Sequence, residues 1–213
     1  MDPNKTHVSL LESLLQDLIG EIVARVGADS PQDYVNFILS CKELAASAPD
    51  KRMRKRLNLA PLVKRPLASS SYQKLMDKWL ANNNPYAHYI EGILEYFVHN
   101  DKFTGLYHFS VAADAGHKEA VYLYAIILLC KGLTNSGQHY LSQLKWEEDT
   151  TMVDKCWENI KTSLHGIRVL RKRLYVTSLR QMKPRDACHL YDMNNSCAKC
   201  FYYKQMFKFI YMI

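Results

Sequence analysis

The amino-acid sequence predicts an all-α protein in which a module of three short helices precedes a short α-solenoid of helix pairs. Three observations support this fold class. The N-terminal part carries three successive helix-start signals, the middle part repeats itself at a helix-pair period, and 48% hydrophobic against 23% charged residues is typical of a folded globular chain. We expect the helical module at residues 9–58, a linker at 59–72, the repeats at 73–146, and a basic helical tail, rich in cysteine and aromatic residues, at 147–213.

Each predicted helix of the N-terminal module begins at a serine. Ser13, Ser30 and Ser40 can each accept a hydrogen bond from a first-turn N–H, and Gly27 can take the left-handed conformation that ends the first helix. The hydrophobic residues of that helix, 14–26, advance in pairs by about four and so form a broad apolar stripe. Because three helices this short bury a small core, a partner that covers the remaining apolar face would stabilise the module.

The repeats appear as internal self-similarity in the middle of the chain. Ala87, Tyr89 and the aliphatic pair that follows them recur 33 positions later, beginning with Ala120 and Tyr122. The residues between the two copies indicate a second, antiparallel helix that is closed by Gly116. A period near 34 residues with two helices per unit is typical of a tetratricopeptide-like solenoid.

These motifs resemble a known family. Residues 13–26 (SLLQDLIGEIVARV), 30–35 (SPQDYV) and 40–44 (SCKEL) resemble an F-box. More narrowly, the chain is similar to plant F-box proteins in which SCKEL-type helices precede tetratricopeptide-like repeats with an AA-x-GH-x-EA signature, which is AADAGHKEA here at 112–120. The resemblance covers about residues 9–145. It implies that the module docks on the Skp-type adaptor of a cullin–RING (SCF-type) ubiquitin ligase, while the repeats recruit a target protein.

The resemblance also implies which side chains contact the adaptor. F-boxes usually have Leu-Pro where this chain has Leu14-Leu15, so the fixed φ of proline is lost from the contacting turn and we expect weaker docking. Without the resemblance, the apolar stripe is more typical of an intramolecular core. The alternative function is therefore a helical-repeat scaffold for protein–protein interaction with no ligase role. The expected adaptor-contacting residues are Leu14, Leu15, Leu18, Ile22, Val35, Leu39, Cys41 and Leu44.

The C-terminal tail contains ligand types that zinc prefers. Cys188, His189, Cys197 and Cys200 include one Cys-x-x-Cys spacing and could supply a Cys₃His set. However, the adjacent Cys188 and His189 cannot easily face one ion, and a second cysteine pair is missing. The sequence favours ordinary thiols here, so we expect no bound metal. A zinc-dependent nucleic-acid binder stays open as a third function.

The net charge of +7 is concentrated in two acid-free segments, 51–65 with seven basic residues and 159–185 with eight. Ile167, Leu170 and Leu174 give the second segment an apolar side at helical spacing, which predicts an amphipathic helix that lies on the repeats. Aromatic residues do not interleave with the arginines, as stacking on bases would require. These charges therefore indicate solvated helix faces rather than a nucleic-acid surface.

The remaining features exclude further functional classes. The sequence holds neither a G-x-S-x-G nor an H-E-x-x-H motif, nor a phosphate-binding glycine loop, so we expect neither an enzyme nor a cofactor. The longest apolar run, 120–130, is shorter than the roughly 20 residues of a membrane span, and the first residues lack the pattern of a signal peptide. We expect a cytoplasmic or nuclear protein with reduced cysteines and no membrane contact. The apolar end, 201–213, fits either a helix docked on the repeats or a strand-like tail.

Overall fold

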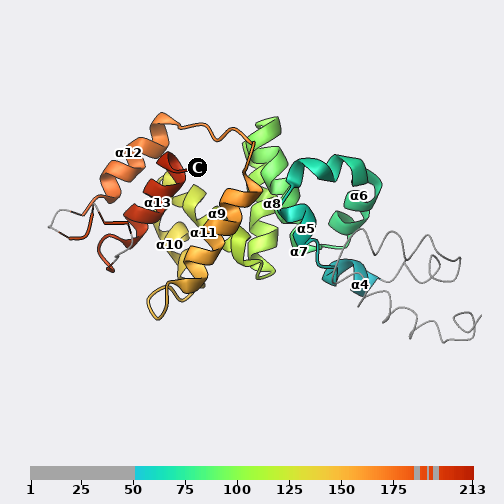
Figure 1. The fold of residues 1–213 in the computed structure, drawn as a ribbon, viewed down its shortest axis with the longest axis horizontal. Coiled ribbons are helices and arrows are strands. Elements are labelled where there is room, and N and C mark those ends of the chain that lie inside the picture. Colours follow the sequence, from blue (N-terminus) through green and yellow to red (C-terminus); the bar gives the residue numbers. More distant parts are fainter. Residues whose placement is uncertain (1–50, 185–187, 191, 194–196) are drawn as a thin grey trace, which may run out of the picture.

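The computed structural model describes residues 51–184, 188–190, 192–193 and 197–213. These residues form helices, turns and connecting segments and contain no β-strand, which confirms the all-α prediction for this part of the chain. The helices follow one another along the long axis of the molecule, from α4 at one end to α12 and α13 at the other (Figure 1). The module predicted for 9–58 lies outside the described residues up to position 50.

Short helices precede the repeats and pack against them. The prolines at 61 and 66, which predicted a linker, stand in the first turns of two helices, where a missing N–H costs nothing. The first of these helices buries Leu62 and Val63, and it packs on the first repeat helix. These elements are α4 (Lys51–Arg56), α5 (Ala60–Val63), the 3₁₀ helix η1 (Pro66–Tyr72) and α6 (Gln73–Ala81).

Two antiparallel helix pairs form the repeats. They are α7 (Pro85–Ile93) with α8 (Lys102–Asp114), and α9 (Lys118–Cys130) with α10 (Thr134–Ser142). The equivalent residues Ala87 and Ala120, and Tyr89 and Tyr122, are all fully buried. Each helix packs against the next one, so the core runs continuously from one pair to the other. The predicted tetratricopeptide-like arrangement is confirmed.

The helix ends explain both the repeat and a change in its register. Asn84 and His117, which are 33 positions apart, cap α7 and α9 by accepting hydrogen bonds from first-turn N–H groups. The left-handed residues that end these first helices, Asn100 (φ 64°) and Gly132 (φ 82°), are only 32 apart. In the first unit α7 continues into η2 (Leu94–His99), a π-helical segment. A π turn accommodates one extra residue, which accounts for the changed spacing.

The long apolar run at 120–130 forms the centre of the fold. Every residue of this run except Tyr124 is buried, because α8, α10, α11, α12 and α13 all pack against α9. The predicted buried helix is confirmed. Among the described residues we find no helix with the length and apolar character that a bilayer span needs.

Three further helices follow the repeats: α11 (Thr151–Ser163), α12 (Arg173–Met182) and α13 (Phe201–Tyr211). Both α11 and α13 pack against α9, and α13 also packs against α12. The apolar C-terminal segment is therefore a helix docked on the repeats, not a strand-like tail. Its buried side chains include Phe201, Met206 and Phe209.

The predicted amphipathic helix through Ile167, Leu170 and Leu174 is wrong. Gly166, with a φ of 79°, follows the end of α11, and the next helix begins only at Arg173. Leu170 and Leu174 are 48% and 52% exposed, and only Ile167 packs partly against the core. The residues that α12 buries are Tyr175, Ser178 and Leu179. The helix starts later than the spacing suggested, so a different face meets the core.

Candidate functional site

All eight residues expected to contact the adaptor lie outside the described residues. These are Leu14, Leu15, Leu18, Ile22, Val35, Leu39, Cys41 and Leu44. The described chain begins at α4, whose end is joined to the repeats by Asn84. The side-chain amide of Asn84 donates to the backbone oxygens of Arg54 (2.7 Å) and Leu57 (2.9 Å) while its oxygen caps α7. The chain that leaves the module is thus held directly against the first repeat.

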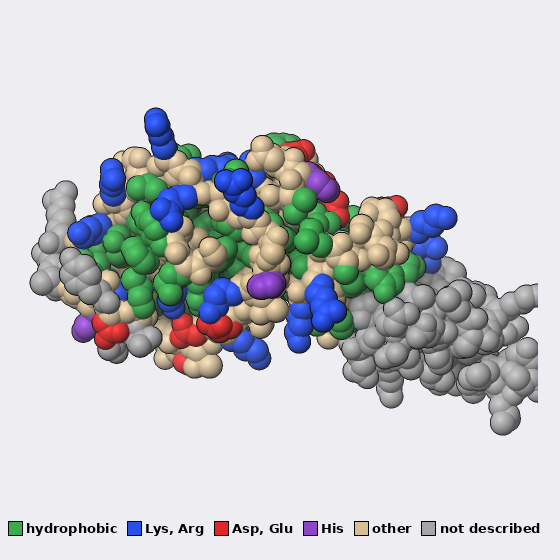
Figure 2. Space-filling model, turned by 45° about the horizontal axis from the view of Figure 1, so that its top comes forward, with side chains coloured by type: hydrophobic (Ala, Val, Ile, Leu, Met, Phe, Trp, Pro, Cys, Tyr) green, Lys and Arg blue, Asp and Glu red, His purple; other side chains and the backbone are tan. Residues whose placement is uncertain are grey.

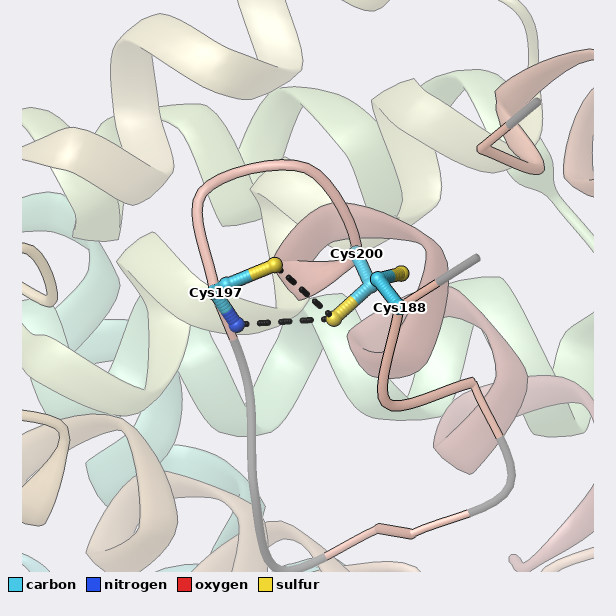
Figure 3. Close-up of side chains that lie close together, drawn as sticks. All are labelled: Cys188, Cys197 and Cys200. Carbon is cyan, nitrogen blue, oxygen red and sulfur yellow. Dashed lines mark hydrogen bonds between the residues drawn. The ribbon is translucent and has the colours of Figure 1, made fainter. Parts of the chain in front are cut away.

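Three cysteines of the C-terminal segment come together in space. The sulfur atoms of Cys188, Cys197 and Cys200 all lie within 4.8 Å of one another (Figure 3). The Sγ atoms of Cys197 and Cys200 are 3.7 Å apart, and the backbone N–H of Cys197 points at the sulfur of Cys200, with an N···S distance of 3.4 Å. The sequence named these residues together with His189, and the structure brings the three thiols into one cluster.

Local structure around α13 holds this thiol cluster in place. The backbone N–H groups of Cys200 and Phe201 both donate to the carbonyl of Cys197, which closes a tight turn before the helix. Phe201 is fully buried and stacks on Trp146 with the ring centroids 3.8 Å apart. The buried ammonium of Lys204 donates to the backbone oxygen of Asp192, in the loop between Cys188 and Cys197. The turn, the helix and the loop are therefore fixed to one another.

The environment of Cys197 favours a thiolate. Backbone N–H groups of Cys200 and Lys199 that point at the sulfur, together with a hydrogen bond from His189, lower the pKa of this thiol to about 6. For Cys188, partial burial and the neighbouring thiols raise the pKa instead.

Two other cysteines differ from the cluster. Cys130 and Cys156 are buried in the helical core, and burial raises the pKa of both thiols, to about 12 for Cys156. They are protonated at neutral pH and act as small apolar residues.

A small cavity of about 100 Å³ lies where α5, α7, α9 and α11 meet. Its lining includes Tyr86, His117, Glu119 and Asn159. The amide of Asn159 donates to the Glu119 carboxylate at 2.6 Å, and His117 stacks on the buried ring of Tyr89 with centroids 4.7 Å apart. His117 therefore packs within the repeat and caps α9.

Acidic solution should destabilise the fold through His117. Burial lowers the pKa of this imidazole to about 4 from an ordinary 6.5, against the opposing effect of the Glu119 carboxylate. Only the neutral ring can accept the capping N–H of Ala120. The unfolded chain binds the proton more tightly, so this stabilisation is complete above pH 6.5 and is lost as the pH falls towards 4. We expect a loss of about 3 kcal/mol in the free energy of unfolding over that interval.

Urea unfolding at several pH values would measure this loss. The matched variant is His117→Asn, since asparagine caps helices well but does not titrate in this range. The buried His88, whose pKa also falls to about 4 through burial, contributes in the same direction in both proteins. The difference between the two proteins in how steeply the free energy of unfolding falls with pH is therefore due to His117. Equal pH dependence in the two proteins would contradict this assignment.

Basic side chains meet aromatic rings, two of which are distant in sequence. Lys102 lies over the ring of Tyr96, and Lys172 lies 5.8 Å from the same ring and 5.6 Å from that of Tyr175. Arg171 lies 4.4 Å from the ring of Tyr211 on α13. The contact of Lys172 with Tyr96 joins the segment after α11 to the first repeat unit, and the contact of Arg171 with Tyr211 joins it to α13. Sequence reasoning missed these two contacts because the partners are far apart in the chain.

The exposed apolar side chains of the described residues include two groups. Phe103 and Tyr107 on α8 are 87% and 57% exposed, and they stand one helical turn apart on the same face. On the face drawn in Figure 2, hydrophobic side chains gather over the half of the molecule that holds α12 and α13, with Lys and Arg side chains around them. The large exposed hydrophobic residues of these helices are Leu174 and Tyr211, and Met212 and Ile213 follow directly after α13.

Comparisons with known proteins identify the repeats and a set of relatives. A family model described as plant tetratricopeptide repeats matches residues 60–165. This range contains every helix from α5 to α11. A relative from Arabidopsis thaliana, described as an F-box protein, is 56% identical over 146 residues, which cover 68% of this chain and 90% of that protein.

Two further relatives from the same plant are more distant. One, described as a putative F-box protein, is 34% identical over 130 residues, and the aligned part covers 61% of this chain and 44% of that protein. The other, described as an F-box protein, is 26% identical over 127 residues, which cover 58% of this chain and 34% of that protein. The chain thus spans less than half of these two relatives. No solved structure matches it.

Proposed function

Because the chain belongs to the plant F-box proteins with tetratricopeptide-like repeats, we propose that it is a substrate-recognition adaptor of an SCF-type cullin–RING ubiquitin ligase. In this proposal residues 9–58 dock on the Skp-type adaptor and, through it, on the cullin. The helices that follow recruit a target protein. The protein acts by proximity and without catalysis, as proteins of these families generally do.

The similarity to the first relative is the observation that carries the proposal. A protein described as an F-box protein matches this chain over 90% of its own length at 56% identity. An F-box is a small helical unit with a surplus of apolar side chains, and residues 14–26 have that character. The eight residues from Leu14 to Leu44 that the resemblance assigns to adaptor contact belong to this proposal.

We also propose where the target binds. Large exposed aromatic side chains are typical anchors of protein interfaces, because they bury much area with little loss of conformational entropy. Phe103 is 87% exposed on the second helix of the first repeat, and Tyr107 extends the same face. Both lie on α8, away from the contact of Asn84 with the end of α4. One chain could then hold the adaptor and the target at separate surfaces.

The substitution Leu18→Asp tests the adaptor contact. A carboxylate in the apolar stripe would have to be desolvated in the interface, so we expect binding to a purified Skp-type adaptor to weaken at least about 100-fold. Isothermal titration calorimetry with the full chain measures this directly. The matched control is Leu133→Asp, a leucine that is 50% exposed at the start of α10, and it should bind like the wild type.

The two functional hypotheses predict different results. If the N-terminal helices only cap the solenoid, the wild-type chain does not bind the adaptor, and Leu18→Asp changes only the unfolding midpoint. A helical-repeat scaffold without a ligase role would then replace the adaptor. Far-UV circular dichroism of all three proteins shows whether a loss of binding comes from unfolding.

A further inference from the structure

The thiol cluster before α13 is built from two segments of the chain. Cys188 comes from one segment, and Cys197 and Cys200 come from a turn that leads directly into the helix (Figure 3). Cys200 is fully buried, whereas Cys188 and Cys197 are partly exposed, so an ion could enter from solvent. We propose that Cys188, Cys197 and Cys200 bind a structural zinc ion, with the imidazole of His189 as the fourth ligand. This proposal is independent of the adaptor function.

The spacing of the sulfur atoms fits tetrahedral zinc. With Zn–S bonds of about 2.3 Å, two thiolates of a tetrahedral site lie about 3.8 Å apart. The Sγ atoms of Cys197 and Cys200 are 3.7 Å apart, and Cys188 completes a set within 4.8 Å. The third sulfur therefore needs to move by no more than about 1 Å to reach the ideal tetrahedral distance.

The turn from Cys197 to Cys200 also supplies the hydrogen bonds that zinc thiolates accept. Backbone N–H groups of Lys199 and Cys200 point at the sulfur of Cys197, and the N–H of Cys197 points at the sulfur of Cys200. Such donors hold thiolate ligands in place and offset their negative charge. Ordinary buried thiols have no need of them, and Cys130 and Cys156 lie in apolar helical surroundings instead.

His189 is the candidate for the fourth ligand, although its ring nitrogens do not lie within 4.8 Å of all three sulfur atoms and the ring must shift to reach the ion. Its side chain already hydrogen-bonds to Cys197, although it follows Cys188 directly in the chain. The chain turns at this point, because the N–H of Leu190 donates to the carbonyl of Cys188 at 2.7 Å and the N–H of Asp192 donates to that of His189 at 3.1 Å. The turn brings two adjacent side chains towards one cluster, which the sequence alone made difficult to expect.

The charges near the cluster also suit this ion. Three thiolates and one Zn²⁺ carry a net charge of −1, and Lys199 stands inside the Cys-x-x-Cys turn. Lys204 is only 1% exposed, and its ammonium holds the loop through Asp192. The described residues between positions 188 and 200 form turns and irregular segments rather than a helix, and a bound metal stabilises such segments effectively.

Metal analysis of the full chain, purified under reducing conditions, tests the proposal. We expect about one zinc ion per chain, retained after gel filtration. The variants Cys188→Ser and Cys197→Ser should lose it, whereas Cys156→Ser, which removes a core thiol outside the cluster, should keep it. Cobalt added to the metal-free wild type should give the intense visible bands of a tetrahedral thiolate site, a readout that needs no variant to fold. His189→Ala should weaken zinc binding at least about tenfold.

Several results would overturn the proposal. One is a metal-free wild type that takes up neither zinc nor cobalt at stoichiometric levels. Another is equal zinc content in the cluster variants and in Cys156→Ser. A Cys197–Cys200 disulfide, seen as two missing thiols in a thiol titration of the native chain, would assign the pair to redox chemistry instead. Unchanged zinc affinity in His189→Ala would remove His189 from the site.

Discussion

Replacing Gly105 with valine is expected to lower the free energy of unfolding by at least about 3 kcal/mol, because the added atoms enter space already filled by backbone. An added Cβ at this position would lie 2.7 Å from the backbone nitrogen of Tyr96 and 2.8 Å from its Cα. A flexible side chain could turn aside, but the π-helical segment η2 cannot yield without moving α7 away from α8. Urea unfolding followed by circular dichroism measures the loss.

A glycine without this close approach provides the control. Gly116, between α8 and α9, has a φ of 84°, and in the described part of the chain no atom lies within 4 Å of an added Cβ. Gly116→Ala should cost only about 1 kcal/mol, from backbone strain alone. If both variants lost the same amount, conformational strain rather than close packing of the repeat helices would explain Gly105.

Truncating Phe201 to alanine should cost about 3–5 kcal/mol, since it leaves a large cavity in a packed core. The ring is fully buried between α13 and Trp146, and its stacking on the indole is nearly parallel, at 8°. The loss should appear in the unfolding midpoint. It should also appear as faster hydrogen exchange of α13, because this helix is held mainly by its aromatic face.

The control for Phe201 is Phe103→Ala. That ring is 87% exposed, so its removal should change the free energy of unfolding by less than about 0.5 kcal/mol. A similar loss in both variants would show that truncation of any phenylalanine destabilises this chain, and the docking of α13 on the repeats would lose its support.

The sequence predicted the repeat helices because their defining residues are local. Ala87 and Ala120, with Tyr89 and Tyr122, recur at fixed spacing and all point into one core. The glycine that closes α8 acts through its own backbone conformation, so it too is visible in the sequence. The buried helix at 120–130 followed from its uninterrupted apolar run.

Features that depend on tertiary contact were not predictable in this way. The π turn of η2 shifts the register by one residue, but its sequence, LEYFVH, reads as ordinary helix. The helix expected through Leu170 and Leu174 starts only at Arg173, because the segment after Gly166 meets Tyr96 of η2 through Lys172 and Tyr211 of α13 through Arg171. Periodicity can identify an apolar face, but contacts with other parts of the chain decide where the helix begins.

Among the candidate metal ligands, too, local spacing predicted some features and tertiary contacts decided the others. The Cys-x-x-Cys spacing identified Cys197 and Cys200, whereas the approach of Cys188 depends on the loop that Lys204 holds through Asp192. Adjacent residues at 188 and 189 argued against a shared ion until the turn at Leu190 was known. For the adaptor surface, the sequence and the relatives supply all of the support, because those residues precede the described part of the chain.

Capture of partners from plant cell extract tests the central claim most directly. The full chain and its Leu18→Asp variant would be used side by side, and bound proteins quantified by mass spectrometry. The proposed function predicts that the wild type recovers a Skp-type adaptor and a cullin, and that both are lost with Leu18→Asp. Target proteins that bind at the proposed surface around Phe103 should be recovered with both proteins. Recovery of such partners with neither the adaptor nor the cullin would contradict it and would leave a helical-repeat scaffold.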